Sequence, residues 1–459
     1  MAAKVGRGAV AVAAVVEEDA GAVVDVEEVS RKISFYKHFN VSSCNKCYCN
    51  TLIADSMKPA FFLFLFAAQI VFAQKNTSQV LDSEVSAVVE KYIAENKIPG
   101  AVVAIKKGNK ILLKKAFGYA KLKEFDGSVS EHPETMTVNH LFDIASLTKV
   151  IGTTTAVMKL HDEGKLNVDD PASKYVKGLD EGEKAKITLR HLLTHTSGMY
   201  EWYPLYYFSQ QRATTYAFIK QLPLKYPVGE GRHYSDLGFT ILGEIIEKVS
   251  GKPLDIYVKT EIFAPLKMTK TTYKPDKKAN LIAATSMGNP YEKRMVEDTT
   301  LGFVVKDLDP KSWNGWRQYV LQGEVNDGNA WYANEGISGA AGLFSTVDDL
   351  QKLVDMLKNK GKVRGKSFIS EKTVTLFLTQ DTFKNGLGWM MDPINSFMKN
   401  GPTGTFGHTG FTGTSISVVP EKKLSVIILI NRQNMGLQTT RDYFNPNPIR
   451  DAIFKAAVK

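Results

Sequence analysis

The hydrophobic pattern predicts strands near both ends of the chain. In residues 78–96, apolar side chains recur every three or four positions, which predicts an amphipathic helix that ends at Pro99-Gly100. The stretch AVVAIKKGNKILLKKAFGYA then predicts two strands joined by a turn at Gly108-Asn109. Near the C-terminus, GTSISVVPEKKLSVIILINR predicts a second hairpin that turns at Pro420 to Lys423, with a final helix from about Pro448.

The long middle of the chain has helical periodicity instead. It is clearest in residues 150–163, 189–193, 237–249 and 347–357, and no repeat of fixed period is visible. Strands at both ends with helices between them favour an α+β fold. We expect one antiparallel sheet built from both ends, flanked by helices and carrying an inserted all-helical region, with a cleft between the layers.

The N-terminal part differs in composition from the rest of the 459 residues. Residues 1–29 are a mixture of mainly Ala, Val, Glu and Asp without any aromatic residue, which is typical of poorly ordered sequence. MKPAFFLFLFAAQIVFAQKN follows, with a short basic start, an apolar stretch too short for a typical membrane span, and small residues before a cut after Ala73. A buried core helix is the alternative interpretation of this stretch.

We interpret residues 57–73 as a secretory signal peptide, with translation starting at Met57. Residues 1–56 are then a low-complexity or artefactual extension, and residues 74–459 form an exported domain, periplasmic or extracellular. If residues 1–56 are translated, residues 59–73 would instead anchor the protein in a membrane.

Cysteine and charge narrow the class of protein. The three cysteines, Cys44, Cys47 and Cys49, precede the expected cut and lack a second ligand pair, so we expect a structural or chance origin and no disulfide in the exported domain. The formal net charge is +10, but the basic residues are scattered among acids. Nucleic-acid binding is therefore not expected, while attraction to an anionic envelope or substrate is.

Ser146 and Lys149 are the first candidates for chemistry, in FDIASLTKVIG at the head of a helical pattern. A serine hydroxyl is a poor nucleophile at neutral pH, so it needs a nearby base and a site for the developing oxyanion. Residues three apart on a helix share a face, so Lys149 can reach Ser146. The pair is weak evidence by itself, because serine caps many helices and lysine is common inside them.

Two further motifs strengthen this candidate. GRHYSDLGF places Tyr234 and Asp236 just before an amphipathic helix, and TFGHTGFTG places His408-Thr409-Gly410 at the entry to a strand. With Ser146/Lys149 as S-x-x-K, and in this order, the motifs resemble those of the penicillin-recognising serine hydrolases, in particular class C β-lactamases with their D,D-peptidase and esterase relatives. HLLTHTSGM, EIFAPLKMTKTTY, GLGW and AAGLFSTVDDL extend the resemblance to essentially residues 78–459.

The resemblance implies a mechanism through an acyl-enzyme. Ser146 would attack a carbonyl, and a cationic Lys149 would lower the pKa of Tyr234, which would relay the proton. The backbone N–H groups of Ser146 and Phe411 would form the oxyanion hole. Neither a metal nor an organic cofactor is expected. The substrate-binding residues would be Asp236, His408, Thr409, Gly410 and Phe411.

Two residues depart from the family pattern. His408 stands where the family has a lysine that holds a carboxylate, and its ordinary pKa of about 6.5 would leave it mostly uncharged at neutral pH. Asp236 replaces an asparagine, and a carboxylate only accepts hydrogen bonds, so we expect it to pair with Lys149 or to receive an N–H from the substrate. Both changes argue against efficient β-lactam turnover.

We therefore predict a serine hydrolase that acts on amide or ester bonds of peptidoglycan-type substrates. The segment GEVNDGNAWYANEGISGAAGLFST, together with Tyr-Ser-Asp and His-Thr-Gly, resembles a branch linked to peptidoglycan turnover, although Asn326 stands where its relatives have histidine. A promiscuous carboxylesterase or weak class C-like β-lactamase is one alternative. A non-catalytic penicillin- or cell-wall-binding protein is another.

Other candidates for a site have more ordinary interpretations. His191 and His195 are four residues apart, as in a helical metal pair, but no H-E-x-x-H glutamate follows, so we favour a structural role. His233 would either line the cleft or face solvent. The aromatic cluster in residues 200–208 would form a wall for sugars or acyl chains, or part of the core.

Overall fold

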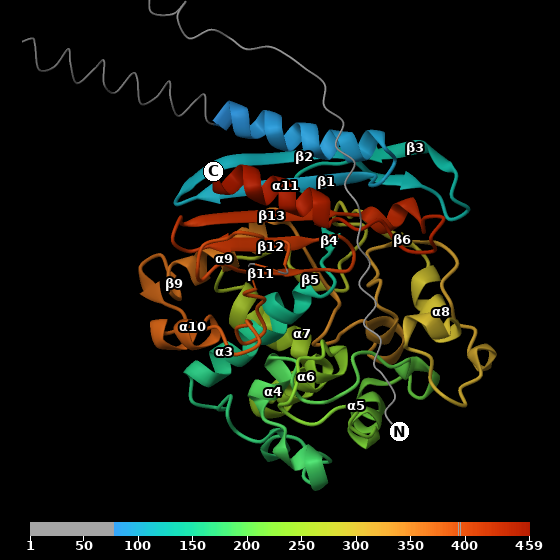
Figure 1. Ribbon diagram of the computed structural model, residues 1–459, viewed down its shortest axis with the longest axis vertical. Coiled ribbons are helices and arrows are strands. Elements are labelled where there is room, and N and C mark those ends of the chain that lie inside the picture. The colour runs from blue at the N-terminus through green and yellow to red at the C-terminus, as the bar shows by residue number, and fades with distance from the viewer. Residues whose placement is uncertain (1–77, 393, 395) are drawn as a thin grey trace, which may run out of the picture. The chain divides into compact units, whose positions relative to one another are not determined.

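One antiparallel sheet joins the two ends of the part of the chain that the structure describes. The computed structural model describes residues 78–459 except 393 and 395, all within the compact unit Ile70–Lys459. The six strands lie in the order β11-β12-β13-β1-β2-β3 (Figure 1). Their bounds are β1 (Gly100–Lys107), β2 (Lys110–Lys123), β3 (Val129–Thr135), β11 (Phe406–Thr409), β12 (Ser415–Val419) and β13 (Leu424–Ile430). Both predicted hairpins form, one from β1 and β2 and the other from β12 and β13, and the pairing of β1 with β13 joins them into one sheet. The predicted α+β class is confirmed.

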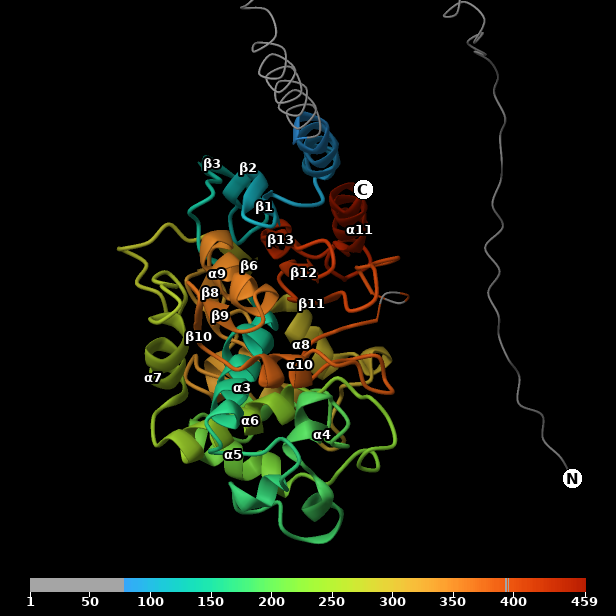
Figure 2. The same cartoon turned by 90° about the vertical axis from the view of Figure 1, so that its left-hand side faces the viewer.

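Both faces of this sheet are covered. In β1, Ala101, Val103 and Ile105 pack on the outer face against the helix of residues 78–94 and against α11 (Asn447–Val458). Val102 and Ala104 point to the other face, where α9 (Val347–Lys358) packs. Figure 2 shows α9 and α11 on opposite faces of the sheet. Burial on both faces explains why β1 is an apolar run rather than an alternating pattern.

The middle of the chain forms the predicted helical region, which packs on the inner side of the sheet (Figures 1 and 2). Its α-helices are α3 (Thr155–Asp162), α4 (Leu189–Leu193), α5 (Arg212–Gln221), α6 (Asp236–Ser250), α7 (Leu254–Tyr257), α8 (Pro290–Glu297) and α10 (Glu371–Phe377). Wider π-helical turns form η1 (Lys149–Thr154), η5 (Val258–Phe263) and η8 (Asn329–Ala333).

Short elements complete the fold. The 3-10 turns are η2 (Ala172–Lys174), η3 (Gly182–Lys186), η4 (Leu205–Tyr207), η6 (Thr299–Leu301), η7 (Pro310–Ser312) and η9 (Arg432–Met435). Three small antiparallel sheets are β4-β8-β5, β6-β7 and β10-β9. Their strands are β4 (Phe142–Asp143), β5 (Thr272–Tyr273), β6 (Ala284–Met287), β7 (Val320–Gln322), β8 (Leu343–Ser345), β9 (Lys362–Val363) and β10 (Lys366–Ser367).

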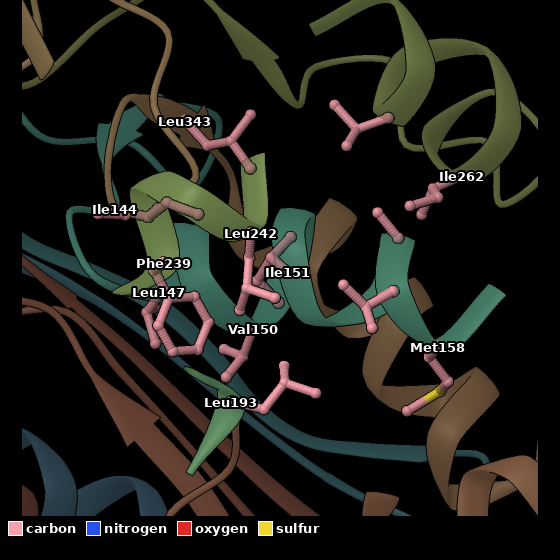
Figure 3. Close-up of a cluster of buried hydrophobic side chains, with 14 of the residues drawn as sticks. Ile144, Leu147, Val150, Ile151, Met158, Leu193, Phe239, Leu242, Ile262 and Leu343 are labelled. Carbon is pink, nitrogen blue, oxygen red and sulfur yellow. The ribbon is translucent and has the colours of Figure 1, made fainter. Parts of the chain in front are cut away.

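A buried apolar cluster fixes η1 against α6, as Figure 3 shows. Leu147, Val150 and Ile151 pack with Phe239 and other side chains of the large core, and all four are fully buried. Burying side chains of this size contributes about 1.5–3 kcal/mol each. The cluster therefore holds the helical segment after Ser146 and the start of α6 in one rigid body, and the two motifs meet because their apolar neighbours pack together.

The predictions for the N-terminus concern other residues. The expected extension, signal peptide and cysteine cluster lie outside the described residues. Within residues 78–459, leaving aside 393 and 395, no helix is long and apolar enough to cross a membrane.

Candidate active site

Ser146 lies in a sharp turn that leads from β4 into a helical segment. Ala145, just before it, has a φ of 44°, a left-handed conformation that costs a non-glycine residue about 1–2 kcal/mol. Asp143 supports the turn, since its Oδ1 accepts the N–H of Ala145 at 2.9 Å and its backbone oxygen accepts the hydroxyl of Thr412 at 2.8 Å. Ser146 is thus presented at a helix N-terminus, where the helix dipole favours negative charge.

Lys149 is fully buried directly beneath Ser146. Its Nζ donates to Ser146 Oγ at 3.0 Å and to the backbone oxygen of Ala340 at 2.9 Å. It also forms an ion pair with Asp236, with 2.7 Å between Nζ and Oδ1. The pairing of Lys149 with Asp236 agrees with the expectation from the sequence, and it gives the buried ammonium a counter-charge.

The serine in the middle of the Tyr-Ser-Asp motif caps a helix. Ser235 is the N-cap of α6, because its Oγ accepts the N–H of Gly238 at 3.1 Å while donating to the backbone oxygen of Tyr200 at 2.7 Å. Tyr234 is therefore held just outside the helix, and Asp236 lies inside its first turn. This places both side chains toward Lys149 from the same helix end.

Tyr234 completes the cluster around Ser146. Its hydroxyl interacts electrostatically with the side chains of Ser146 and Lys149, and its ring centroid lies 5.1 Å from Lys149 Nζ. On its other side the ring packs against His195, with 4.3 Å between the ring centroids. Because the phenol contacts the serine and the ammonium together, it is the group best placed to exchange a proton with Ser146.

The electrostatics of this cluster differ in part from the sequence-based expectation. Burial alone would lower the pKa of Lys149, but the Asp236 carboxylate and the Tyr234 hydroxyl outweigh it, so the pKa of Lys149 is raised and the amine stays cationic. For Tyr234, burial raises the pKa and the Asp236 carboxylate adds to this, while the Lys149 ammonium opposes it. The pKa of Tyr234 remains above its ordinary value, so the side chain is a neutral phenol at rest.

His408 and Thr409 are the last two residues of β11, not the entry to a strand as the sequence suggested. Strand β11 is short, and the turn that follows it carries Gly410 and Phe411 past the Ser146 turn before β12 begins. A β-carbon on Gly410 would lie 2.2 Å from Thr414 Oγ1 and 2.6 Å from the backbone oxygen of Ile144, so only glycine fits this approach.

His408 is an uncharged residue in this site. It is 1% exposed, its Nδ1 lies 2.8 Å from the backbone oxygen of Thr409, and its Nε2 is buried with no hydrogen-bond partner among the described residues. Burial, aided by the charge of Lys149, lowers the pKa of His408 to about 3. The expectation that His408 is uncharged at neutral pH agrees with this pKa.

An acidic cavity opens on one side of Ser146. It has a volume of about 280 Å³ and includes the carboxylates of Asp236, Glu292 and Asp327. Burial raises the pKa of Glu292 to about 8, and the nearby Asp327 adds to the shift. Burial likewise raises the pKa of Asp327 to about 6, with Asp236 contributing. The rest of the lining is Ala145, Ser146, Trp202, Tyr234, Asn289, Tyr291, Met295, Phe303, Asn326, Ala341, Phe411 and Tyr443.

A basic pocket opens on the other side of Ser146. It has a volume of about 440 Å³ and shares Ser146, Tyr234 and Phe411 with the acidic cavity. Three guanidinium groups line it, together with the His-Thr-Gly turn: those of Arg232, Arg432 and Arg450. Burial lowers the pKa of all three arginines, to about 10 for Arg432 and to about 9 for Arg450. The charge that His408 does not supply is therefore present on neighbouring side chains.

The remaining histidine candidates have structural positions. His191 lies in the first turn of α4, where its Nδ1 accepts the N–H of Thr188 at 3.2 Å. His195 accepts the N–H of Ser235 at 3.0 Å, so it supports the Tyr-Ser-Asp motif from behind. His233 stacks on Tyr226 with 3.4 Å between the centroids, and it lines neither of the two pockets beside Ser146.

The aromatic cluster of residues 200–208 is divided between the cavity wall, the core and the surface. Trp202 lines the acidic cavity, whereas Tyr206 is 1% exposed and belongs to the core. Phe208 is exposed and stacks on Phe218 of α5. In the part of the chain that the structure describes, no three His, Cys, Asp or Glu side chains come close enough to hold a metal ion.

A family model described as Beta-lactamase matches residues 85–445. The chain belongs to this β-lactamase family. The resemblance stated from the motifs is thereby confirmed, and this member of the β-lactamase family is a hydrolase. It is 34% identical over 390 residues to an N-acetylmuramyl-L-alanine amidase of Bacillus subtilis (strain 168), covering 79% of this chain and 83% of the relative. It is also 34% identical over 388 residues to a Salmonella paratyphi A protein named as a D-alanyl-D-alanine carboxypeptidase, covering 78% and 84%.

Solved structures agree on the fold of this β-lactamase-family chain. EstCE1, a hydrolase with promiscuous acyltransferase activity, superimposes with a TM-score of 0.61 at 20% identity, covering 82% of this chain and 99% of its own. The octameric penicillin-binding protein homologue from Pyrococcus abyssi has a TM-score of 0.58 at 24% identity, covering 82% and 76%. At these identities the likeness concerns the fold alone.

Sequence reasoning missed three acidic residues of this site. No site role was predicted for Asp143, Glu292 or Asp327, although Glu292 and Asp327 line the acidic cavity and Asp143 supports the Ser146 turn. Asp143 binds the N–H groups of Ala145 and of Asn326, at 2.9 and 2.7 Å, and so joins the Ser146 turn to the segment that carries Asp327. The only signal in the sequence was their nearness to recognised motifs, since Asp143 stands three residues before Ser146 and Asp327 directly follows Asn326.

Proposed function

We propose that this hydrolase forms an acyl-enzyme on Ser146 and cleaves amide or ester bonds of peptidoglycan-type substrates. The observation that carries the proposal is the contact of Ser146 Oγ with Lys149 Nζ at 3.0 Å, in a cluster that includes the Tyr234 hydroxyl. The substrate class is supported by the relatives named as a muramyl-alanine amidase and as a carboxypeptidase. These relatives also support export, for which residues 57–73 would be the signal.

Acylation needs a base for the Ser146 proton and a donor for the leaving group. Lys149 is cationic and donates to Ser146 Oγ, so it cannot take that proton itself. We assign the relay to Tyr234. Its oxygen accepts the proton of Ser146 as its own proton passes to the leaving amine or alcohol, which leaves the phenol neutral before and after the step. Water then replaces the leaving group, and the same relay runs in reverse to release the acid.

The oxyanion of the tetrahedral intermediate needs donors aimed at one point. We assign this role to the backbone N–H groups of Ser146 and Phe411, which belong to two turns that Gly410 allows to approach closely. Arg432 donates to the backbone oxygen of Phe411, with 2.6 Å from its Nη2, and so holds this turn in place. Removal of one such donor typically lowers kcat by about 10²–10³-fold.

The test is to incubate purified full-length protein with a muropeptide digest and follow the product masses, beside a Ser146→Ala variant. New fragments made only by the wild type would support a cell-wall hydrolase and identify the bond. An adduct of a fluorophosphonate probe on Ser146 tests the nucleophile separately. Equal hydrolysis by Ser146→Ala would overturn the mechanism.

A carboxylesterase is the second candidate. The apolar and aromatic wall of the acidic cavity, including Trp202, Met295 and Phe303, offers a surface for an acyl chain. An unchanged muropeptide digest together with rapid, Ser146-dependent turnover of short-chain esters would favour this candidate. Absence of any adduct on Ser146 would favour the non-catalytic binding protein.

A further inference from the structure

The acidic cavity contains more carboxyl groups than its basic neighbours can pair with. Asp236 is paired with Lys149, but Glu292 and Asp327 have no ion pair to a lysine or arginine among the described residues. Arg317 is close enough to act on both carboxyls through its charge, but it is already bonded to Asn289 Oδ1 at 3.1 Å and to the backbone oxygen of Val325 at 2.8 Å. Carboxyl groups that lack a counter-charge gain one when a cation binds between them, and this favours their ionised form.

Glu292 has an acceptor without a partner in this cavity. Its Oε2 accepts the N–H of Gly328 at 2.8 Å, but its Oε1 is buried and no hydrogen-bond donor lies within normal distance. The Tyr206 hydroxyl is nearby, yet it too lacks a partner at hydrogen-bond distance. A buried acceptor left without a donor costs about 1–3 kcal/mol, so the carboxylate is prepared for a donor that arrives with a ligand.

The walls of the cavity indicate which kind of cation would bind. Besides the carboxylates, aromatic rings of Trp202, Tyr291, Phe303, Phe411 and Tyr443 line it. Aromatic faces attract organic ammonium groups, whereas a hydrated metal ion gains little from them. Ligand pockets usually measure about 300–1,000 Å³, so a cavity of 280 Å³ suits one arm of a substrate rather than a whole substrate.

We propose that this cavity binds a protonated amine of the substrate, so that preferred substrates carry an ammonium group on the Asp236 side of the scissile carbonyl. The inference rests on the proposed function, because it places the reacting carbonyl at Ser146. Glu292 and Asp327 hold the ammonium, and the aromatic rings pack around its alkyl chain. Burial is the main cause of the raised pKa of both carboxyls, and a bound ammonium would oppose this effect by favouring their ionised form.

The experiment compares two esters that differ only in charge. The p-nitrophenyl esters of 6-aminohexanoic acid and of 6-acetamidohexanoic acid present an ammonium or a neutral amide at the same distance from the carbonyl. For the wild type we expect kcat/KM to be at least about tenfold higher for the amino ester, which corresponds to about 1.4 kcal/mol. A ratio near one in the wild type would overturn the proposal.

The variants Glu292→Gln and Asp327→Asn should each reduce this ratio at least threefold, and together they should bring it near one. Because the ratio compares two substrates in one preparation, a loss of folded protein does not change it. Glu297→Gln is the matched control, since Glu297 is an exposed carboxylate on the same helix, α8, and its removal should leave the ratio unchanged. An equal fall of the ratio in the control would overturn the proposal.

A binding measurement separates this proposal from the proposed function. Calorimetric titration of the Ser146→Ala variant with hexylamine and with hexanol requires no catalysis. Binding of hexylamine that is lost in Ser146→Ala/Glu292→Gln would support the ammonium site even if neither ester were hydrolysed. Equal affinity for the amine and the alcohol would overturn it even if Ser146 proved to be the nucleophile.

Discussion

The two pockets beside Ser146 are lined by opposite classes of ionisable group, carboxyls in one and guanidiniums in the other. The acidic cavity holds Glu292 and Asp327, whose carboxyl pKa values are raised by burial, while the basic pocket holds three arginines whose pKa values are lowered by burial. Each shift has burial as its main cause, because burial disfavours the charged form and the opposite charges nearby do not compensate for it. Both pockets would be stabilised by ligand groups of the opposite sign.

This difference shows how the site around one nucleophile can determine the orientation in which its substrate binds. A substrate with an ammonium on one side of its carbonyl and an anion on the other matches the two pockets in only one orientation. Ser146, Tyr234 and Phe411 line both pockets, so the reacting carbonyl would lie where the two potentials meet. The following predictions test this comparison, from the largest expected effect to the smallest.

Removal of the Lys149 ammonium, which lies beside Ser146, should nearly abolish activity on any substrate. We expect Lys149→Met to lower kcat for p-nitrophenyl butyrate by about 10³-fold or more, since the ammonium that contacts Ser146 Oγ and Tyr234 is lost. Asp236 is then left without its partner, so denaturant unfolding should show a loss of stability of about 2–5 kcal/mol. Lys149→Met/Asp236→Asn is the control, which should recover stability but not activity. Activity within tenfold of the wild type would contradict the assigned role.

Changing the two residues that depart from the family pattern should raise β-lactam turnover. We expect Asp236→Asn/His408→Lys to hydrolyse a chromogenic cephalosporin about 10–100-fold faster than the wild type, because a neutral amide donor at position 236 contributes about 0.5–1.5 kcal/mol and an ammonium donor at position 408 at most about 1.5–3 kcal/mol. Asp236→Asn should supply most of the gain, since a lysine at position 408 would lie in the pocket that already holds Arg232, Arg432 and Arg450. The two single variants measure each share. No gain in any of the three would contradict our account of these departures.

The basic pocket should matter only for substrates that bring an anion. We expect Arg232→Gln to lower kcat/KM by about tenfold for a peptide that ends in a free carboxylate, as one charge-assisted hydrogen bond would, and less for its carboxamide. Initial rates on both peptides give the ratio. Arg364→Gln serves as the control, because Arg364 is exposed and lines neither of the two pockets. Equal losses on the two peptides would mean that Arg232 acts through Tyr234, over whose ring it lies at 5.9 Å, and not on the anion.

The two pockets should also limit stability at opposite ends of the pH scale. Since the pKa of Glu292 is raised to about 8, its contribution to stability is lost as pH rises from about 4.5 to 8. Since the pKa of His408 is lowered to about 3, its contribution is lost as pH falls from about 6.5 to 3. Each slope is at most about 1.4 kcal/mol per pH unit.

Denaturant unfolding at several pH values measures these slopes. Glu292→Gln should flatten the decline on the alkaline side, and His408→Asn should flatten the decline on the acid side. Glu297→Gln is again the control, because its exposed carboxylate should change neither slope. A variant that changed the acid-side and alkaline-side slopes of stability equally would contradict the assignment of one group to each pocket.

Most of the fold could be predicted from local patterns. Helices α6 and α9 and both hairpins follow from apolar spacing that is nearly continuous and from turn residues such as Gly108 and Pro420. The predicted position of His408 at the entry to a strand was wrong, since His408 lies near the end of β11. A four-residue strand that pairs on one edge leaves almost no periodic signal in the sequence. The short strands β4, β5 and β8 were not predicted for the same reason.

The candidate site was predicted as far as its motifs reach. Ser146, Lys149, Tyr234 and His408 were placed in one cluster by their resemblance to family motifs, and the structure brings them together. Their catalytic roles remain predictions. Glu292 could not be found, since an isolated glutamate near the start of a helix is commonplace in any sequence.

The sequence by itself determined the classes of residue that could react and the elements that carry them. These features are local: a serine three residues before a lysine, a Tyr-Ser-Asp motif whose serine caps a helix, and a glycine that permits close approach. Each depends only on residues that are neighbours in the sequence. Only the tertiary structure decided the charge around the nucleophile. Asp236, Glu292 and Asp327 come from separate segments, as do Arg232, Arg432 and Arg450. Burial shifts the pKa of Glu292, of Asp327 and of the three arginines, and no sequence spacing contains the distances that determine this burial.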